Sequence, residues 1–236
     1  AHVDGVIYYL LDNQYYFKRK DLYGHYDDAE RYAFFSRAVL EIIPYIDFIP
    51  DVIHCNDWQT AMIPVYKTLF YGDNIYKDIK TVFTIHNIQY QGKYGTELIA
   101  DVLGIPEDKA SLVEYSGSVN LMKGAIECAD KVTTVSRTYA EEILDPWFSH
   151  GLDSILKERQ NKLCGIVNGI DIEVYNPETD PLTDAHFSAD EPLGKTKAKR
   201  LLQERMGLPV KGEVPVIGTV SRLVGHKGLD LVKCVF

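Results

Sequence analysis

The sequence predicts an α/β protein built on a doubly wound parallel sheet, and three observations support this prediction. Short β-branched and aromatic runs alternate with helix-like segments along the chain. Several runs end abruptly in polar residues, as Thr81–Ile85 (TVFTI) ends in His86 and Asn87. That run shows no clean apolar and polar alternation, which is typical of a strand covered on both faces. Strands and helices in this order indicate βαβ units with right-handed crossovers.

The expected strands share one form, a short apolar run followed by polar residues or a turn. They are Gly5–Leu11, Val52–Cys55, Thr81–Ile85, Lys131–Val135, Leu163–Val167 and Val214–Val220. Between them, the apolar residues of 29–43 and 119–129 each fall on one helical face. Pro64 predicts that the helix after Asp57 is kinked or starts late. Thr138 and Glu141 have the spacing of a capping box for the helix that follows the fourth strand.

A change of composition divides the later part of the chain. Residues 177–192 are acidic, contain proline and have few apolar side chains, which predicts a surface loop. Lys195–Met206 is expected to be a basic helix that ends at Gly207, and residues 209–215 to be a hinge. We therefore expect a first domain at 1–208 and the first strand, loop and helix of a second domain at 209–236. We also expect that the chain begins inside its first domain.

Composition excludes several classes of function. The 236 residues carry 25 lysines and arginines against 34 acids, a formal charge of −9, which argues against nucleic acid or an anionic membrane as a partner. The sequence shows no signal peptide and no apolar run long enough to cross a bilayer. Its four cysteines are far apart, which argues against a disulfide framework or a zinc site and favours a reducing cytoplasm.

The common catalytic fingerprints are missing from the sequence, including the dinucleotide, P-loop and serine-hydrolase motifs and a metal-binding histidine pair. A candidate anion site remains in the stretch SRLVGHKG, where Arg222 and Lys227 lie five residues apart between a predicted strand and a predicted helix. Gly225 and Gly228 let the backbone approach a ligand, and Arg222 offers a planar fork of donors, so the pair suits a diphosphate. Two solvated basic residues on a turn are the alternative.

Three further candidates, Asp57, His86 and Asn168, each follow a predicted strand. In open α/β sheets, loops at the carboxyl ends of strands converge on a crevice where ligands bind. Each residue also fits a local capping role, and Asn168 with Gly169 is a common turn pair. The residues alone leave both interpretations open.

Six stretches taken together resemble bacterial glycogen synthases and plant starch synthases. They are YFKRKDLYG, DVIHCNDWQTAMIPVY, TVFTIHNIQYQGKYG, SVNLMKGAIECADKVTTVSRTYAEEI, GIVNGIDIEVYNPETD and GTVSRLVGHKGLDLV. Their order and spacing match as well, and the resemblance covers the chain from Gly5 to Val232.

The resemblance implies a retaining glucosyltransferase that moves glucose from ADP-glucose to the non-reducing end of an α-1,4-glucan, without a cofactor or metal. It implies two Rossmann-like domains of the GT-B type, of which the N-terminal one holds the glucan. Asp57 and His86 would then line the glucosyl pocket and Asn168 would help to close it. Arg222 and Lys227 would bind the diphosphate, and Tyr16 corresponds to a tyrosine near the sugar. The location implied is the cytoplasm, or a plastid in a plant.

The sequence also departs from the family pattern. The lysine-glycine-glycine loop expected near the start and the glutamate motif expected late in the second domain have no counterpart, so we expect no synthase activity from this polypeptide alone. Gly225 and His226 replace residues that usually include a glutamine, which we expect to be tolerated because Arg222 and Lys227 are kept.

Other functions fit the same fold. A transferase that forms sucrose or trehalose from UDP-glucose would use another donor and a small acceptor, and a non-catalytic glucan-binding module would bind without turnover. A nicotinamide dehydrogenase is disfavoured by the missing glycine fingerprint. Oligomeric state, and the choice between glycogen and starch, do not follow from the residues.

Overall fold

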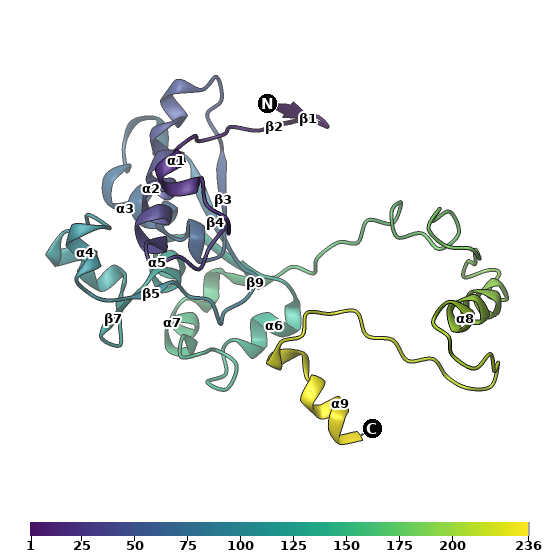
Figure 1. Cartoon of the computed structure of the whole chain (residues 1–236). Coiled ribbons are helices and arrows are strands. Elements are labelled where there is room, and N and C mark those ends of the chain that lie inside the picture. The colour runs from purple at the N-terminus through teal and green to yellow at the C-terminus, as the bar shows by residue number, and fades with distance from the viewer. Residues whose placement is uncertain (236) are drawn as a thin grey trace. The chain divides into compact units, whose positions relative to one another are not determined.

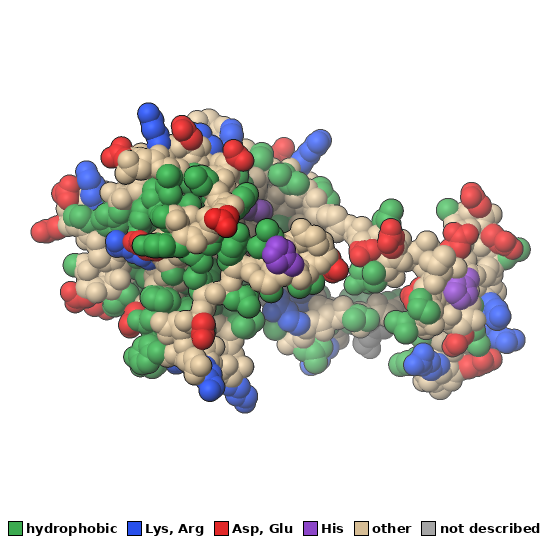
Figure 2. All heavy atoms as spheres, turned by 90° about the horizontal axis from the view of Figure 1, so that it is seen from above, with side chains coloured by type: hydrophobic (Ala, Val, Ile, Leu, Met, Phe, Trp, Pro, Cys, Tyr) green, Lys and Arg blue, Asp and Glu red, His purple; other side chains and the backbone are tan. Residues whose placement is uncertain are grey.

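The computed structural model describes residues 1–235, apart from the side chain of His226. The chain divides into two compact units, Ala1–Asn168 and Gly169 onward, which are considered separately. In the face of the first unit that Figure 2 presents, acidic and basic side chains are interspersed with hydrophobic ones.

The first unit is organised around a parallel sheet with the strand order β3-β4-β8-β9. Its strands are β3 (Val52–Asn56), β4 (Lys80–Ile85), β8 (Lys131–Thr134) and β9 (Leu163–Gly165). Neighbouring strands pair in parallel register, with Cys55 opposite Phe83 and Phe83 opposite Val132. Four of the expected strands are thereby confirmed, with the predicted α/β class.

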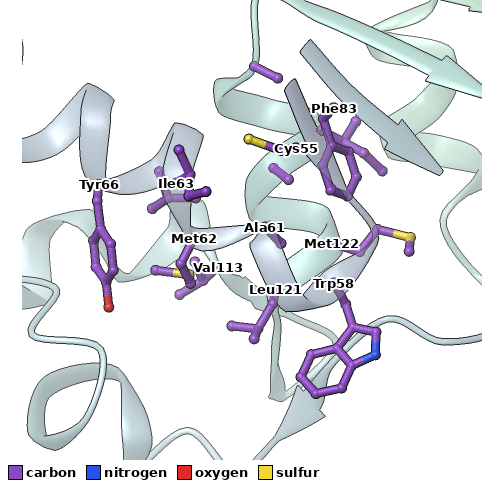
Figure 3. Packing of buried hydrophobic residues seen from close by; sticks show 14 of the residues in the cluster. Cys55, Trp58, Ala61, Met62, Ile63, Tyr66, Phe83, Val113, Leu121 and Met122 are labelled. Atoms are coloured by element: carbon purple, nitrogen blue, oxygen red, sulfur yellow. The ribbon is translucent and has the colours of Figure 1, made fainter. Parts of the chain in front are cut away.

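The helices of the first unit are α1 (Gln14–Phe17), α2 (Asp28–Glu41), α3 (Met62–Phe70), α4 (Leu98–Asp101), α5 (Leu121–Cys128), α6 (Arg137–Glu142) and α7 (Asp153–Glu158). Helix α3 contacts both α2 and α5, so these three form one layer (Figure 1). Figure 3 shows Phe83 and Cys55 of the sheet near Ala61, which directly precedes α3, and near Met122 of α5. All four are almost completely buried, and this contact forms the centre of the core.

Two small antiparallel sheets complete the unit. Strands β1 (His2–Val3) and β2 (Val6–Ile7) form a hairpin, and β5 (Lys93–Tyr94), β7 (Ser118–Asn120) and β6 (Glu114–Tyr115) form a three-stranded sheet. The prediction of one strand over Gly5–Leu11 is therefore wrong. Asp4 and Gly5 both have positive φ and turn the chain between β1 and β2.

The starts of α3 and α6 can be compared with the sequence predictions for these two helices. After Asp57 the chain makes one 3₁₀ turn at Trp58–Thr60, and α3 then begins at Met62 with Pro64 in its first turn, where proline is tolerated. The predicted late start is confirmed. The capping box is wrong, because α6 is capped by the Ser136 side chain, which accepts from the Tyr139 N–H at 2.9 Å.

The second unit contains α8 (Gly194–Arg205) and α9 (Leu229–Val235). Gly207 follows α8 with φ +66, in agreement with the predicted helix end. Residues 177–192 form neither helix nor strand, as the acidic composition predicts. The strand expected over Val214–Val220 is wrong: no strand occurs in the described part of this unit, so these residues have no neighbour with which to form a ladder.

Candidate functional site

The backbone of Asp57 is unusual for a residue with a side chain. Asp57 follows β3 directly and has φ +57 and ψ −178. This conformation is adopted almost only by glycine and costs a residue with a Cβ about 1–3 kcal/mol. Such strain persists only where surrounding contacts hold it, and it is concentrated at functional sites. The carboxyl end of β3 is therefore the first place to look for a site.

Three groups of contacts hold Asp57 in place. Its backbone N–H donates to the Thr84 carbonyl of β4 at 3.0 Å. Its Oδ1 accepts from the backbone N–H of His86 at 2.9 Å. Its carbonyl accepts from both the N–H of Thr60, at 3.1 Å, and the hydroxyl of Thr60, at 3.2 Å. The ends of two adjacent parallel strands are thus joined through one carboxylate.

The ring of His86 is fixed from the neighbouring strand. Its Nε2 lies 2.9 Å from Oδ1 of Asn56, the last residue of β3. With the Asn56 amide oxygen as the acceptor, Nε2 of His86 is the donor of this hydrogen bond. His86 is exposed and Asp57 half-buried, so this pair is accessible to a ligand. The structure therefore brings together Asp57 and His86, and it adds Asn56, which sequence reasoning missed.

A row of polar side chains crosses the sheet beside this pair. His54 Nε2 lies 2.6 Å from the Thr84 hydroxyl, which lies 2.6 Å from the Thr133 hydroxyl. Thr84 and Thr133 are opposite each other in adjacent strands. Sequence reasoning also missed this row. The available signal was that polar residues occupy alternate positions at the end of β3, at His54 and Asn56.

The loop that carries His86 is anchored at its far end by Gln91. This side chain is almost fully buried, and its Nε2 donates to the carbonyls of Ile88 and His150, at 3.0 and 3.2 Å. Its Oε1 accepts from Asn120 Nδ2 at 2.7 Å, and Asn120 caps α5 by accepting from the Lys123 N–H. The TIHNIQYQG loop is thus tied to a helix start.

The contacts of Tyr16 are with residues of α1 and α2, not with Asp57 or His86. It belongs to α1, and its hydroxyl donates to the Glu30 carboxylate of α2. This hydrogen bond is the main reason that its pKa is raised to about 12. The Tyr16 ring also packs against Phe34, with ring centroids 5.0 Å apart.

Asn168, Arg222 and Lys227 are not among the residues that make the contacts described above. Asn168 is exposed and closes the first unit, three residues after β9. Arg222 and Lys227 are exposed in the second unit, where Gly225–Lys227 forms a 3₁₀ turn before α9. Gly228 has φ +68, which explains why glycine stands there. The roles of all three residues remain predictions.

Two features are absent from the residues that the structure describes. Within residues 1–235, no three histidine, cysteine, aspartate or glutamate side chains come together as metal ligands would. Among the described helices, none has both the length and the apolar composition needed to cross a bilayer.

A parallel α/β sheet with strained and hydrogen-bonded polar residues at adjacent strand ends defines a domain of the open, ligand-binding α/β class. Comparison with known families is more specific. Residues 1–158 match the model of the starch synthase catalytic domain, and the chain belongs to this family.

Individual relatives agree with this assignment. The chain is 51% identical to a glycogen synthase of Bacillus cereus (strain ATCC 10987 / NRS 248), covering 99% of this chain and 50% of that protein. A glycogen synthase of Anoxybacillus flavithermus is 49% identical, with 99% and 49% covered. The chain thus spans about half the length of these curated relatives. The resemblance seen in the sequence is confirmed.

A solved structure supports the fold. It is the catalytic domain of starch synthase IV from Arabidopsis thaliana bound to ADP and acarbose, which matches with a TM-score of 0.81 and 35% identity. The match covers 93% of this chain and 46% of that one. The predicted fold class, a Rossmann-like glycosyltransferase domain of the GT-B type, is confirmed.

Proposed function

We propose that this chain provides the glucan-binding side of a retaining glucosyltransferase that moves glucose from ADP-glucose to the non-reducing end of an α-1,4-glucan. The observation that carries the proposal is the strained Asp57, held by the His86 N–H at the ends of β3 and β4. Glycogen synthases among the relatives, and a structural neighbour bound to ADP and acarbose, support this choice of substrates. The four free cysteines agree with a reducing location, for which we propose the cytoplasm, or a plastid in a plant.

The charges that develop during transfer suggest a role for each residue. When the bond to ADP breaks, negative charge grows on a phosphate oxygen, and Arg222 and Lys227 would stabilise it without proton transfer. Positive charge grows on the sugar at the same time, as in glycoside hydrolysis. The Asp57 carboxylate would stabilise that charge, while His86 would contact the glucosyl unit. Asn168 would help to close the pocket, and Tyr16 would contact sugar nearby.

A chimera tests this proposal with an activity readout. The 236-residue chain would replace the matching half of the Bacillus cereus glycogen synthase, and transfer of labelled glucose to maltoheptaose would be measured. We expect transfer from ADP-glucose in preference to UDP-glucose. Replacing Arg222 or Lys227 by alanine in the chimera should lower kcat about a hundredfold, equivalent to about 3 kcal/mol of barrier.

The control is Lys211→Ala, which removes an exposed basic residue of the same unit. A chimera that melts cooperatively but transfers no glucose from ADP-glucose would refute the proposed function. Preference for UDP-glucose would refute the assignment of the donor, and unchanged kcat in both Arg222→Ala and Lys227→Ala would remove the basic pair from the site.

A further inference from the structure

Asn168 and Gly169 form the only Asn-Gly pair in the sequence. Asn168 ends the first compact unit and Gly169 begins the second, so the pair lies where the chain passes from one unit to the other. Both residues are exposed, and neither belongs to a helix, strand or turn. An asparagine in such a segment is open to a covalent reaction of its own side chain, whose rate depends on the residue that follows.

This reaction is an attack on the asparagine side chain by the backbone nitrogen of the next residue. The nitrogen forms a bond to the side-chain carbonyl carbon, Cγ, and the bond from Cγ to the amide nitrogen breaks. Ammonia leaves and carries away the backbone proton, so that a five-membered succinimide ring remains. Water then opens the ring at either carbonyl, which gives aspartate or isoaspartate. The net change is the loss of ammonia and the gain of water, with no oxidation or reduction.

The attacking nitrogen is not engaged at Gly169. Among the described residues, the Gly169 N–H donates no hydrogen bond, and the Asn168 side chain has no hydrogen-bond partner. Asn56 shows the opposite case, because the N–H of the following Asp57 donates to the Thr84 carbonyl at 3.0 Å. A nitrogen held in this way cannot turn toward the preceding side chain. Asn56 is therefore protected from the reaction, and Asn168 is not.

The backbone at Gly169 does not require a glycine. A Cβ built at this position would meet no atom within 4 Å, and φ of Gly169 is not positive. What glycine provides here is freedom of rotation, because the absence of a Cβ lets the peptide nitrogen approach Cγ of Asn168 without hindrance. A larger residue at 169 would hinder the ring closure without disturbing the fold.

The seven other asparagines lack this combination of features. Five of them use their side chains in hydrogen bonds, namely Asn13, Asn56, Asn87, Asn120 and Asn176. The remaining two, Asn74 and Asn161, lie in 3₁₀ turns. Asn74 is followed by Ile75, whose branched Cβ crowds the nitrogen. Asn161 is followed by Lys162, whose N–H donates to the Arg159 carbonyl at 3.1 Å.

We propose that Asn168 is a site of spontaneous deamidation, at which this chain is converted with time into a mixture of aspartate and isoaspartate. Either product replaces the two N–H donors of the amide by a carboxylate that only accepts, and isoaspartate also adds a methylene group to the main chain. Both changes would impair closure of the glucosyl pocket. That consequence rests on the proposed function, whereas the modification rests on Asn168 and Gly169 alone.

The test is incubation of the purified 236-residue chain at neutral and at mildly alkaline pH, followed by tryptic digestion and mass spectrometry. Residues 163–195 form one tryptic peptide, and fragment ions distinguish Asn168 from Asn176 within it. We expect Asn168 to lose its amide, faster at the higher pH because the attacking nitrogen must lose a proton. Gly169→Val should slow this loss about tenfold, because a β-branched side chain crowds the nitrogen.

Three controls separate this reaction from general damage. A sample digested without incubation gives the amide loss caused by handling. Asn74 and Asn161, which are also exposed, should keep their amides. A synthetic peptide of residues 163–195 gives the rate without a fold, and the folded chain should react within about threefold of it, because an exposed segment without hydrogen bonds is open locally.

Two results would overturn the inference. The first is an Asn168 that stays intact in the folded chain while the synthetic peptide loses its amide, since the fold would then protect the site. The second is a loss at Asn74 or Asn161 that is as fast as the loss at Asn168. A cooperative thermal melt of Gly169→Val at the parent temperature would show that its slower reaction is not an effect of altered folding.

Glucose transfer by the chimera distinguishes this inference from the proposed function. As Asn168 is converted, transfer should fall in proportion to the amide lost, and each chimera is compared with its own activity before incubation. Constant transfer during amide loss would refute the role of Asn168 in the pocket and leave the modification established. A chimera that never transfers glucose would refute the proposed function, while the amide measurement on the chain would still decide the inference.

Discussion

Residues 52–58 and 214–222 have the same sequence pattern, an apolar run that ends in polar residues, but only the first forms a strand. Strand β3 pairs with β4 along its whole length, from Val52 opposite Lys80 to Asn56 opposite Thr84. Its Cys55 is completely buried. In the second unit, Ile217 is 78% exposed, and the segment around it has no ladder among the described residues.

The difference shows what an apolar run contributes by itself. A strand leaves half of its backbone donors and acceptors pointing sideways, and they must be paired by a neighbour. Its side chains gain about 25 cal/mol for each Å² of apolar surface buried only if another layer covers them. Residues 214–220 have the composition of a strand, but within the described residues of their own unit they have neither a paired strand nor a covering layer. The polar residues behind them, Arg222 included, consequently lack the strand end that positions Asp57.

The largest expected effect compares the two regions directly. Phe83→Ala would leave a cavity in the sheet core and should lower the free energy of unfolding by about 3–5 kcal/mol. Ile217→Ala, at an exposed position, should change it by less than about 0.5 kcal/mol. Urea unfolding followed by the fluorescence of Trp58, in a Trp147→Phe background, reports on the core alone, because the chain has two tryptophans.

Similar losses in both variants would contradict this comparison, since they would mean that residues 214–220 are buried as well as β3 is. Ile88→Ala, at another fully buried position near the site, is a second core control and should also destabilise by several kcal/mol, about 2–5.

A smaller effect is expected where the first region is strained. Asp57→Ala keeps the unfavourable φ and removes the acceptor of the His86 N–H, so we expect a loss of about 2 kcal/mol. Asp57→Gly removes the same acceptor but relieves the strain, so it should be more stable than Asp57→Ala by about 1 kcal/mol. Denaturant unfolding of the two variants gives this difference directly.

The relative stability of Asp57→Gly and Asp57→Ala shows whether the backbone of Asp57 is strained. If Asp57→Gly were less stable than Asp57→Ala, the positive φ would not be a source of strain, and the argument that singles out Asp57 would lose its main support.

The parallel sheet was predictable because burial on both faces leaves a readable sequence pattern. Runs such as Thr81–Ile85 consist of β-branched and aromatic residues, and the helices between them carry one apolar face. The β1–β2 hairpin and the β5-β7-β6 sheet were not predicted, since their strands have only two or three residues. Elements this short are decided by turns and by distant neighbours, as Asp4 and Gly5 show.

The site was predictable in part for a related reason. Asp57 and His86 could be found because they follow strands, and the sheet edge that they share is a property of the topology. Asn56 and Thr84 could not be assigned in this way, because their roles depend on the register that sets them opposite each other at the ends of β3 and β4. Register is fixed by tertiary pairing, which a single sequence does not display.

A more modest effect concerns the start of α6, where the predicted capping residue differs from the observed one. Ser136→Ala removes the acceptor of the Tyr139 N–H and should cost about 1 kcal/mol. Thr138→Ala, at an exposed position within the helix, should change stability by less than about 0.5 kcal/mol. Thermal unfolding of both variants compares them. A larger loss from Thr138→Ala would restore the capping box.

The smallest expected effect depends on pH and concerns Asp130, which ties the start of β4 to the turn before β8. Burial alone would raise the pKa of Asp130, but this is outweighed by hydrogen bonds from the Thr81 N–H and hydroxyl, and by Lys80. The pKa in the folded state is therefore below the ordinary value of 3.8.

A lowered pKa stabilises the folded state at pH values above the ordinary value, because the folded protein binds the proton less readily than the unfolded chain does. This contribution is lost as the pH falls below about 4 and through the lower folded pKa. Urea midpoints should thus fall less between pH 7 and pH 3 in Asp130→Asn than in the parent chain, while Asp12→Asn should follow the parent. If Asp130→Asn and the parent fall in parallel, the Thr81 contacts do not favour the ionised carboxylate, and the tie between β4 and β8 contributes through packing alone.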